Sequence, residues 1–181
     1  ITGKNSSFQK DIRVTIYDKY PTMALYSVTY TNLGSQAVTL ECWVNNHLAI
    51  HVGKGVDTKE SFWSYQPGSY EARPDWVQPL EKGFEWENYL GMNATDYGGG
   101  TPVCDIWRKD VGIAVGHVEM TPQLISLPVS MPDEENATLG VVYREKVIEL
   151  NAGERLTTYC TFVAVHQGDY FTTMVNYRNF M

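Results

Sequence analysis

The segment NYLGMNATDYGGGTPVCDIWRKDVGIAVGH, from Asn88 to His117, is the most informative part of this sequence. It contains three consecutive glycines, Gly98 to Gly100, which suit a backbone that takes positive φ or lies close to another surface. Pro102 ends this glycine-rich segment, and two strand-like segments follow it. The stretch therefore predicts a loop that leads into paired antiparallel strands.

Alternation of apolar and polar residues continues on both sides of this stretch. Ile12, Val14 and Ile16 fall on one face of a first predicted strand, because side chains alternate across a strand with a period of two. A second strand has Ala24, Tyr26, Val28 and Tyr30 on one face, and Asn32 to Ser35 forms a turn after it. A third strand is predicted to carry Val38, Leu40, Cys42 and Val44 on one face, opposite Thr39, Glu41 and Trp43.

The C-terminal half contains regular predicted strands and then a helix. The strands are Val103 to Arg108, Gly112 to Glu119, Leu124 to Met131, Thr138 to Leu150 and Arg155 to His166. The last of these is apolar on both faces, which indicates a central strand. Asp169 is a suitable N-cap for a helix in which Tyr170, Met174, Tyr177 and Met181 recur at helical spacing.

Residues 53–100 interrupt this pattern with glycines and prolines. Long irregular segments in compact domains are usually functional or poorly ordered, and the many aromatic residues favour order. We interpret 53–100 as an aromatic-rich insertion at one edge of the fold.

These patterns predict an all-β protein, a large antiparallel two-sheet β-sandwich with a C-terminal linker helix over 168–181. With 181 residues, a single domain over 1–181 is expected. An (α/β)8 barrel takes about 250 residues, so this chain does not contain one. It starts at Ile1 and has no terminating signal after Met181, which we interpret as a fragment of a longer protein.

Charge and composition exclude several classes of partner. The net charge is −7 and the basic residues are scattered, which argues against nucleic acid and anionic membranes. No apolar run approaches the roughly 20 residues of a membrane span. Neither a cofactor nor a metal is expected, since the histidines are dispersed and the cysteines have no metal-ligand spacing. Cys42, Cys104 and Cys160 are predicted to be buried free thiols, with one disulfide as the alternative.

Aromatic residues near the glycine-rich loop suggest a carbohydrate ligand. They are Trp76, Trp86, Tyr89, Tyr97 and Trp107, and Asp, Asn and Arg lie among them. A sugar stacks its C–H face on a ring and needs planar polar partners for its hydroxyls. The alternative is that these aromatics fill the core of the β-sheet protein.

The sequence resembles the N-terminal β-domain of melibiase-type α-galactosidases, glycoside hydrolase family 36, especially forms from gut Bacteroidetes. The resemblance is carried by ENYLGMNATDYGGGTPVCDIWRKDVGIAVGHVE at Glu87 to Glu119 and by LISLPV at Leu124 to Val129. It is also carried by YPTMALYSVTYTNLGSQAVTLECWVNN at Tyr20 to Asn46. It covers most of the chain from about Asp11 onward.

This resemblance implies a supersandwich of the galactose-mutarotase-like type. The chain would be a non-catalytic accessory domain that packs on the catalytic barrel of an α-galactosidase-like enzyme and shapes its cleft. Galactosides or other carbohydrates and that barrel are the expected partners, with a homo-oligomer as a further expectation. A periplasmic or secreted location is expected, with the cytoplasm as the alternative. The expected sugar-contacting residues are Asn93, Asp96, Tyr97, Gly98, Gly99, Gly100 and Trp107.

Catalysis within this chain is not expected. The acidic and histidine candidates are Asp75, Glu85, Glu87, Asp96, Asp105, Asp110, His117 and Glu119. Glu85 and Glu87 share one strand face, but a solvated surface explains them. In the resembled family both catalytic aspartates lie on the barrel, so no catalytic residue is assigned here.

Three alternatives remain open from the sequence. One is a free-standing carbohydrate-binding module, which exposed tryptophans in line would favour. Another is an aldose-epimerase-like enzyme that uses His117 and Glu119, although a structural histidine explains this pair better. The last is a structural scaffold that contacts no sugar.

Overall fold

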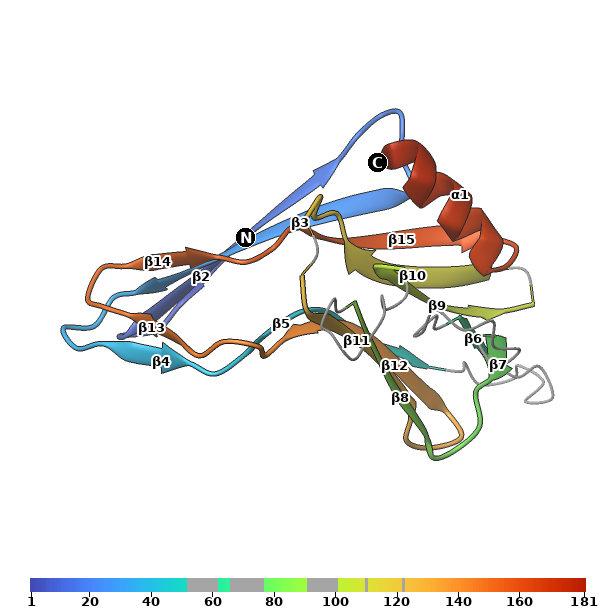
Figure 1. Cartoon of the computed structure of the whole chain (residues 1–181), viewed down its shortest axis with the longest axis horizontal. Helices are drawn as coiled ribbons and strands as arrows, with labels where there is room; N and C mark the ends of the chain where they lie inside the picture. The colour runs from blue at the N-terminus through green and yellow to red at the C-terminus, as the bar shows by residue number, and fades with distance from the viewer. Residues whose placement is uncertain (52–61, 66–76, 91–100, 110, 122) are drawn as a thin grey trace.

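A computed structural model describes the chain except for residues 52–61, 66–76, 91–100, 110 and 122. It is almost entirely β-structure with one helix near the C-terminus (Figure 1). The elements are β1 (Thr2–Lys4), β2 (Phe8–Ile16), β3 (Met23–Asn32), β4 (Val38–Leu40), β5 (Trp43–His51), β6 (Trp63–Tyr65), β7 (Val77–Pro79), β8 (Phe84–Leu90), β9 (Val103–Arg108), β10 (Val111–His117), β11 (Ile125–Met131), β12 (Asn136–Tyr143), β13 (Ile148–Leu150), β14 (Arg155–Thr157), β15 (Thr161–Gln167) and α1 (Tyr170–Phe180).

Two antiparallel sheets form the body of the molecule. The larger sheet has nine strands in the order β1-β2-β3-β15-β10-β9-β6-β7, and β14 also pairs with β3. The smaller sheet has the order β5-β12-β11-β8. β5 packs opposite β15, and β12 packs opposite β10, so the two sheets lie face to face. The predicted all-β sandwich with a C-terminal helix is confirmed.

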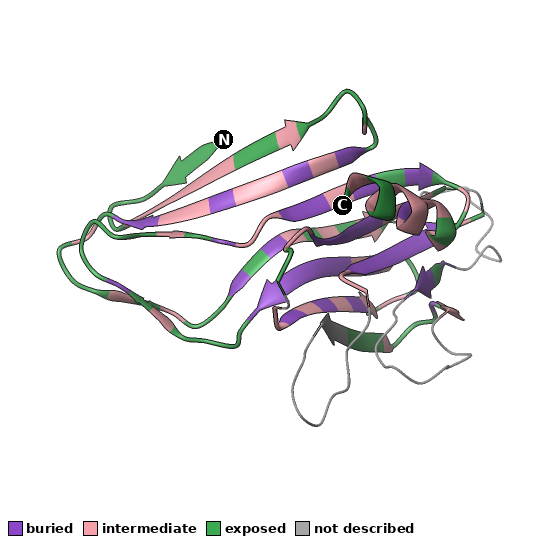
Figure 2. Cartoon of the chain, turned by 45° about the horizontal axis from the view of Figure 1, so that its top comes forward, coloured by how far each residue is buried: buried purple, intermediate pink, exposed green. Residues whose placement is uncertain are grey.

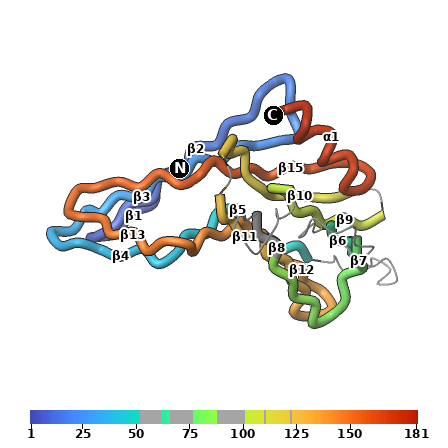
Figure 3. Tube along the Cα trace, viewed as in Figure 1, coloured from blue at the N-terminus to red at the C-terminus, as the bar shows by residue number. Residues whose placement is uncertain are grey.

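An arm extends from this body. It consists of the two-stranded sheet β13-β4 together with β14 and the strand ends that pair with it (Figure 3). Trp43, Tyr143 and Tyr159 form an aromatic cluster beside the arm, with Trp43 and Tyr143 stacked at a centroid distance of 5.5 Å. Such a cluster buries a large apolar area and stabilises the junction of arm and body.

The main core lies between the two sheets (Figure 2). Inward-facing residues of β9 and β10 meet inward-facing residues of β11 and β12, as the alternation along each strand requires. Its buried members include Cys104, Ile106, Val115, Ile125, Leu127, Val129, Ala137, Leu139 and Val141. The apolar alternation that predicted these strands therefore corresponds to this core.

A second core lies on the opposite face of the large sheet, beneath α1. It contains Met23, Leu25, Val103, Ala114, Phe162 and Ala164, with Met174 and Tyr177 of the helix packed against them. The side chain of Asp169 accepts a hydrogen bond from the backbone N–H of Phe171, so Asp169 is the N-cap that the sequence predicts. Helix α1 covers the face that the small sheet leaves open.

The third predicted strand differs from the structure. It is broken at residues 41–42 into β4 and β5, and Trp43 is buried while Val44 is exposed. The break resets the alternation, so the predicted apolar face does not continue past Leu40. Cys42 lies in the break and is exposed, so its predicted burial is wrong.

Two later strands are also divided. The predicted strand 138–150 consists of β12 and β13, and the predicted strand 155–166 consists of β14 and β15. β12 lies in the small sheet and β13 lies in the arm, so the first apolar run contributes to two different sheets. β14 and β15 instead both pair with β3 in the large sheet, where residues 158–160 separate them. β15 lies between β3 and β10, as expected for a central strand.

The segment 53–100 is more regular in its described part than the sequence suggests. It contains β6, β7 and β8, and β8 pairs with β11 along its whole length. Glu85 and Glu87 are exposed on β8 while Phe84 packs against the main core. The glycines and prolines that flank β8 made this short strand difficult to predict from the sequence.

Candidate functional site

Most of the sugar-contacting residues predicted from the sequence lie outside the described residues. They are Asn93, Asp96, Tyr97, Gly98, Gly99 and Gly100. Trp107 is described, and it is only 7% exposed. Its ring lies 5.5 Å from that of Tyr170 at the start of α1, so it packs beneath the helix. A contact between Trp107 and a sugar stays a prediction.

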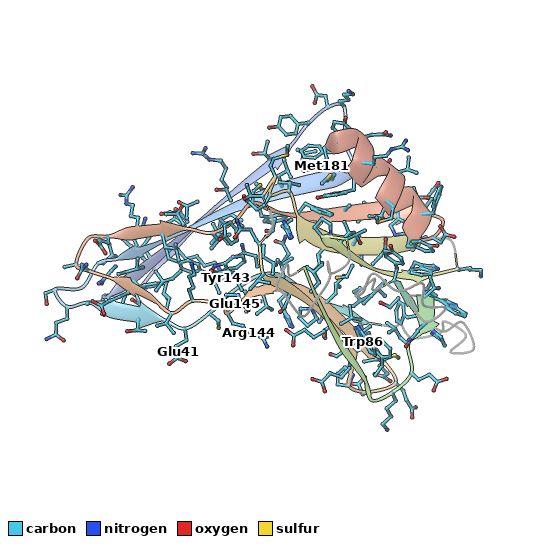
Figure 4. All side chains as sticks on the ribbon, in the orientation of Figure 1. Glu41, Trp86, Tyr143, Arg144, Glu145 and Met181 are labelled. Atoms are coloured by element: carbon cyan, nitrogen blue, oxygen red, sulfur yellow. The ribbon has the colours of Figure 1, made fainter. Side chains whose placement is uncertain are left out.

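The other tryptophans do not form a line. Trp43 is buried in the main core, whereas Trp63 and Trp86 are 41% and 39% exposed. Trp63 belongs to the large sheet, and Trp86 lies on β8 of the small sheet, away from Tyr143 and the aromatic cluster (Figure 4). Trp76 lies outside the described residues. The described tryptophans therefore offer no continuous stacking surface.

The most unusual polar group is a buried pair beneath α1. Nε2 of His166 on β15 lies 2.9 Å from Oδ1 of Asp105 on β9, and both side chains are only 1% exposed. The strand β10 runs between them, so the two side chains meet across it. Thr173, the buried residue of α1, lies close enough to Asp105 to influence its pKa.

Gly112 on β10 makes this contact possible. A Cβ added to Gly112 would lie 2.3 Å from Nε2 of His166 and 2.7 Å from the Cβ of Trp107. Only a residue without a side chain leaves room for His166 to reach across the strand, which is a common role of glycine within a sheet. Tyr65, whose ring stacks on Tyr170 at 4.4 Å, lies opposite Asp105 in the β6–β9 pairing.

Burial and pairing act against each other on these two groups. Burial raises the pKa of Asp105, and the hydrogen bond and charge of His166 oppose it. Burial lowers the pKa of His166, but the hydrogen bond and negative charge of Asp105 raise it above its ordinary value. The pair thus holds its proton away from solvent. Asp105 was among the candidate titratable residues in the sequence. Its partner His166 was not, and Gly112 was the only sequence feature that could have indicated the contact.

The pair His117 and Glu119 is structural. His117 is fully buried, its Nδ1 accepts from the backbone N–H of Glu119 at 3.4 Å, and its Nε2 has no partner within the described residues. The carboxylate of Glu119 accepts the backbone N–H of Cys160 at 2.9 Å. Burial lowers the pKa of His117 to about 4. The described geometry does not support epimerase chemistry here.

His117 predicts a pH dependence of stability. The pKa of His117 falls from 6.5 to about 4 on folding. Its contribution to the free energy of unfolding is therefore complete above pH 6.5 and is lost as the pH falls toward 4. At about 1.4 kcal/mol per pKa unit, this amounts to roughly 3 kcal/mol. We expect His117→Leu to flatten the fall in unfolding free energy between pH 7 and 4, measured by urea denaturation. His51→Leu, at an exposed histidine, is the control, and equal slopes in both variants would contradict the prediction.

The remaining candidate chemistry is limited. Glu87 is paired with Arg144 at 2.9 Å on the surface, as expected for a solvated face. In the part of the chain that the structure describes, no three His, Cys, Asp or Glu side chains gather as metal ligands would. Burial raises the pKa of the Cys104 thiol, so it stays protonated. No helix among the described residues is long and apolar enough to cross a membrane.

Comparisons with known proteins identify others that resemble this chain in sequence or in fold. No protein-family model matches the sequence. A curated relative, the A type blood alpha-D-galactosamine galactosaminidase of Flavonifractor plautii, is 26% identical over 87% of this chain and 14% of its own length. The alpha-galactosidase of Lactobacillus brevis superposes with a TM-score of 0.72 over 94% of this chain and 23% of its own, at 11% identity.

A GH36 alpha-galactosidase from Geobacillus stearothermophilus gives a TM-score of 0.66 over 89% of this chain and 22% of its own, at 16% identity. The chain thus spans less than a quarter of the length of each of these proteins. The expected resemblance in fold is confirmed, whereas the Bacteroidetes type stays a prediction. This chain therefore has the β-sandwich fold that forms one portion of GH36 alpha-galactosidases.

Proposed function

We propose that this chain is a non-catalytic accessory domain of an α-galactosidase-like glycoside hydrolase, where it packs on a catalytic barrel and helps to shape the sugar cleft. The observation that carries the proposal is the shared fold, which extends over 94% of this chain but only 23% of the Lactobacillus brevis alpha-galactosidase. A barrel does not fit into the remaining residues of this chain.

The substrate class is proposed from the same relatives. The curated relative is described as a galactosaminidase, and structures of the Geobacillus enzyme contain stachyose or raffinose. We propose α-galactosides or related sugars as substrates of the whole enzyme. A homo-oligomer and a periplasmic or secreted location stay predictions.

The described titratable groups support a non-catalytic role. Asp105 is committed to His166 beneath the helix, and Glu119 is committed to the backbone of Cys160. Glu87 is paired with Arg144 on the surface. A retaining glycosidase needs two carboxylates about 5 to 5.5 Å apart beside an open cleft, and these groups do not offer that arrangement.

The alternatives have less support. A carbohydrate-binding module built on the tryptophans needs exposed rings in line, but Trp43 and Trp107 are buried and Trp63 and Trp86 lie on different sheets. An epimerase needs His117 to exchange protons with a ligand, and it is fully buried. The scaffold alternative concerns the residues around Gly98, which lie outside the described part of the chain.

We expect the purified chain to show no hydrolysis of p-nitrophenyl α-galactoside or p-nitrophenyl α-N-acetylgalactosaminide, measured by nitrophenol release. A commercial α-galactosidase serves as the positive control. Turnover that copurifies with the chain would contradict the proposal if it is lost in Glu87→Gln or Asp105→Asn, because a contaminating enzyme would not respond to these substitutions.

A further inference from the structure

A groove of about 320 Å³ lies between the large sheet and the edge strand β5. One wall is the inner face of β2 and β3, with Lys10, Ile12, Tyr26 and Val28, and the other wall is β5 from Val44 to Leu48. Val163 of β15 also lines the groove. This volume is within the range of small-molecule pockets, and every lining residue belongs to the described part of the chain.

The wall formed by β5 is shaped by a β-bulge. Asn45 pairs with Val141 and Leu48 pairs with Leu139, so Asn46 and His47 lie opposite Gly140 alone. Asn46 has a φ of 51°, a left-handed conformation that asparagine tolerates better than most residues. A bulge bends an edge strand and interrupts its ladder, so this part of β5 is a poor template for another strand. It instead directs polar side chains toward the groove.

Two asparagine amides are held in place beside the groove. Nδ2 of Asn46 donates to Oγ1 of Thr161 at 3.0 Å, and Nδ2 of Asn45 donates to Oγ1 of Thr158 at 2.9 Å. Asn45 is only 3% exposed, and its Oδ1 has no partner within the described residues. A buried carbonyl oxygen without a donor is costly, so a hydroxyl from a ligand would stabilise it.

The lining selects an uncharged ring that carries hydroxyls. Ile12, Val28 and Val163 offer apolar surface, and Tyr26 offers a ring on which a C–H face can stack. No carboxylate lines the groove, and the ammonium of its one lysine, Lys10, lies 5.3 Å above the ring of Tyr30. We propose that this groove binds a neutral hexopyranoside through Tyr26, Asn45 and Asn46. The site goes beyond the proposed function, which requires no ligand within this chain.

The test is a nuclear magnetic resonance titration of the ¹⁵N-labelled chain with methyl α-D-galactopyranoside, with glycerol as the polyol control. We expect saturable shifts at millimolar sugar for β5 amides and for the residues around Tyr26, and none with glycerol. Asn46→Gly keeps the left-handed backbone but removes the amide, and we expect at least tenfold weaker binding. Lys109→Gly is the matched control, because Lys109 also has positive φ, 57°, outside the groove.

Tyr26→Ala is a second variant, since it removes the stacking ring from a half-buried position and should also weaken binding at least tenfold. Spectra of both variants outside the groove report whether the fold is retained. The proposed sugar site would be wrong if no saturable shifts appeared, or if Asn46→Gly and Tyr26→Ala left the shifts unchanged. Neither outcome affects the proposed accessory role, which the hydrolysis assay tests separately.

Discussion

Asp105→Ala is expected to lower the free energy of unfolding by about 3 to 5 kcal/mol, the range observed when one partner of a buried ion pair is removed. The carboxylate lies 2.9 Å from Nε2 of His166, and both side chains are 1% exposed. Its removal leaves the imidazole with no partner on Nε2, and Nδ1 of His166 already has none within the described residues. The variant also leaves a small cavity beneath α1.

Chemical denaturation at pH 7 measures this effect. Glu134→Ala is the matched control, because its side chain is 80% exposed and forms only a weak surface ion pair with Lys82, at 3.7 Å. We expect it to change the free energy of unfolding by no more than about 0.5 kcal/mol. The double variant Asp105→Leu with His166→Leu should cost much less than the sum of the single changes, because both polar partners are removed together. A cost below about 1 kcal/mol for Asp105→Ala would contradict the assigned role of the pair.

The sequence predicted the strands whose alternation is uninterrupted. Val103–Arg108 is β9 itself, and the predicted faces of the first two strands meet in the structure, since Ile12 pairs with Val28 and Val14 pairs with Tyr26. Alternation succeeds here because a sheet with one buried face fixes its register through that pattern. It failed at residues 41–42, where a local break reset the faces and placed Trp43 in the core.

The candidate site was less accessible to sequence reasoning. The helix that packs against Trp107 begins more than 60 residues later in the sequence, and no local pattern indicates that contact. Asp105 and His166 are likewise distant in sequence and meet only because β10 places a glycine between them. The bulge at Asn46 has no periodic signature, because one extra residue on one strand shifts the pattern without erasing it.

Small residues on the helix-facing side of β10 are a common cause of these contacts. Gly112, Ala114 and Gly116 share that face because strand side chains alternate. Their small size allows His166 and Phe162, on the neighbouring strand β15, to lie across β10. The glycines of the segment from Asn88 to His117 thus continue into β10, where they let the large side chains of His166 and Phe162 lie close to the strand.

Gly116→Ala is therefore expected to destabilise the fold by about 3 kcal/mol or more, at the upper end of overpacked cores. The new Cβ would lie 2.1 Å from the backbone oxygen of Pro102 and 2.8 Å from the ring of Phe162, which is fully buried. The oxygen of Pro102 also accepts the backbone N–H of His117 at 3.1 Å, so it cannot retreat without loss of that hydrogen bond. A side chain could relieve such a clash by changing its rotamer, but the backbone oxygen of Pro102 cannot.

Gly3→Ala is the matched control, since a Cβ at Gly3 meets nothing within 4 Å and its φ is not in the left-handed region. We expect its midpoint of urea denaturation to remain within the equivalent of about 0.5 kcal/mol of the unmodified chain. If Gly116→Ala were equally mild, the close approach of Pro102 to β10 would be wrong. The fit of α1 and Phe162 on this face of the sheet would then need a different explanation, because both depend on the narrow spacing that Gly116 allows.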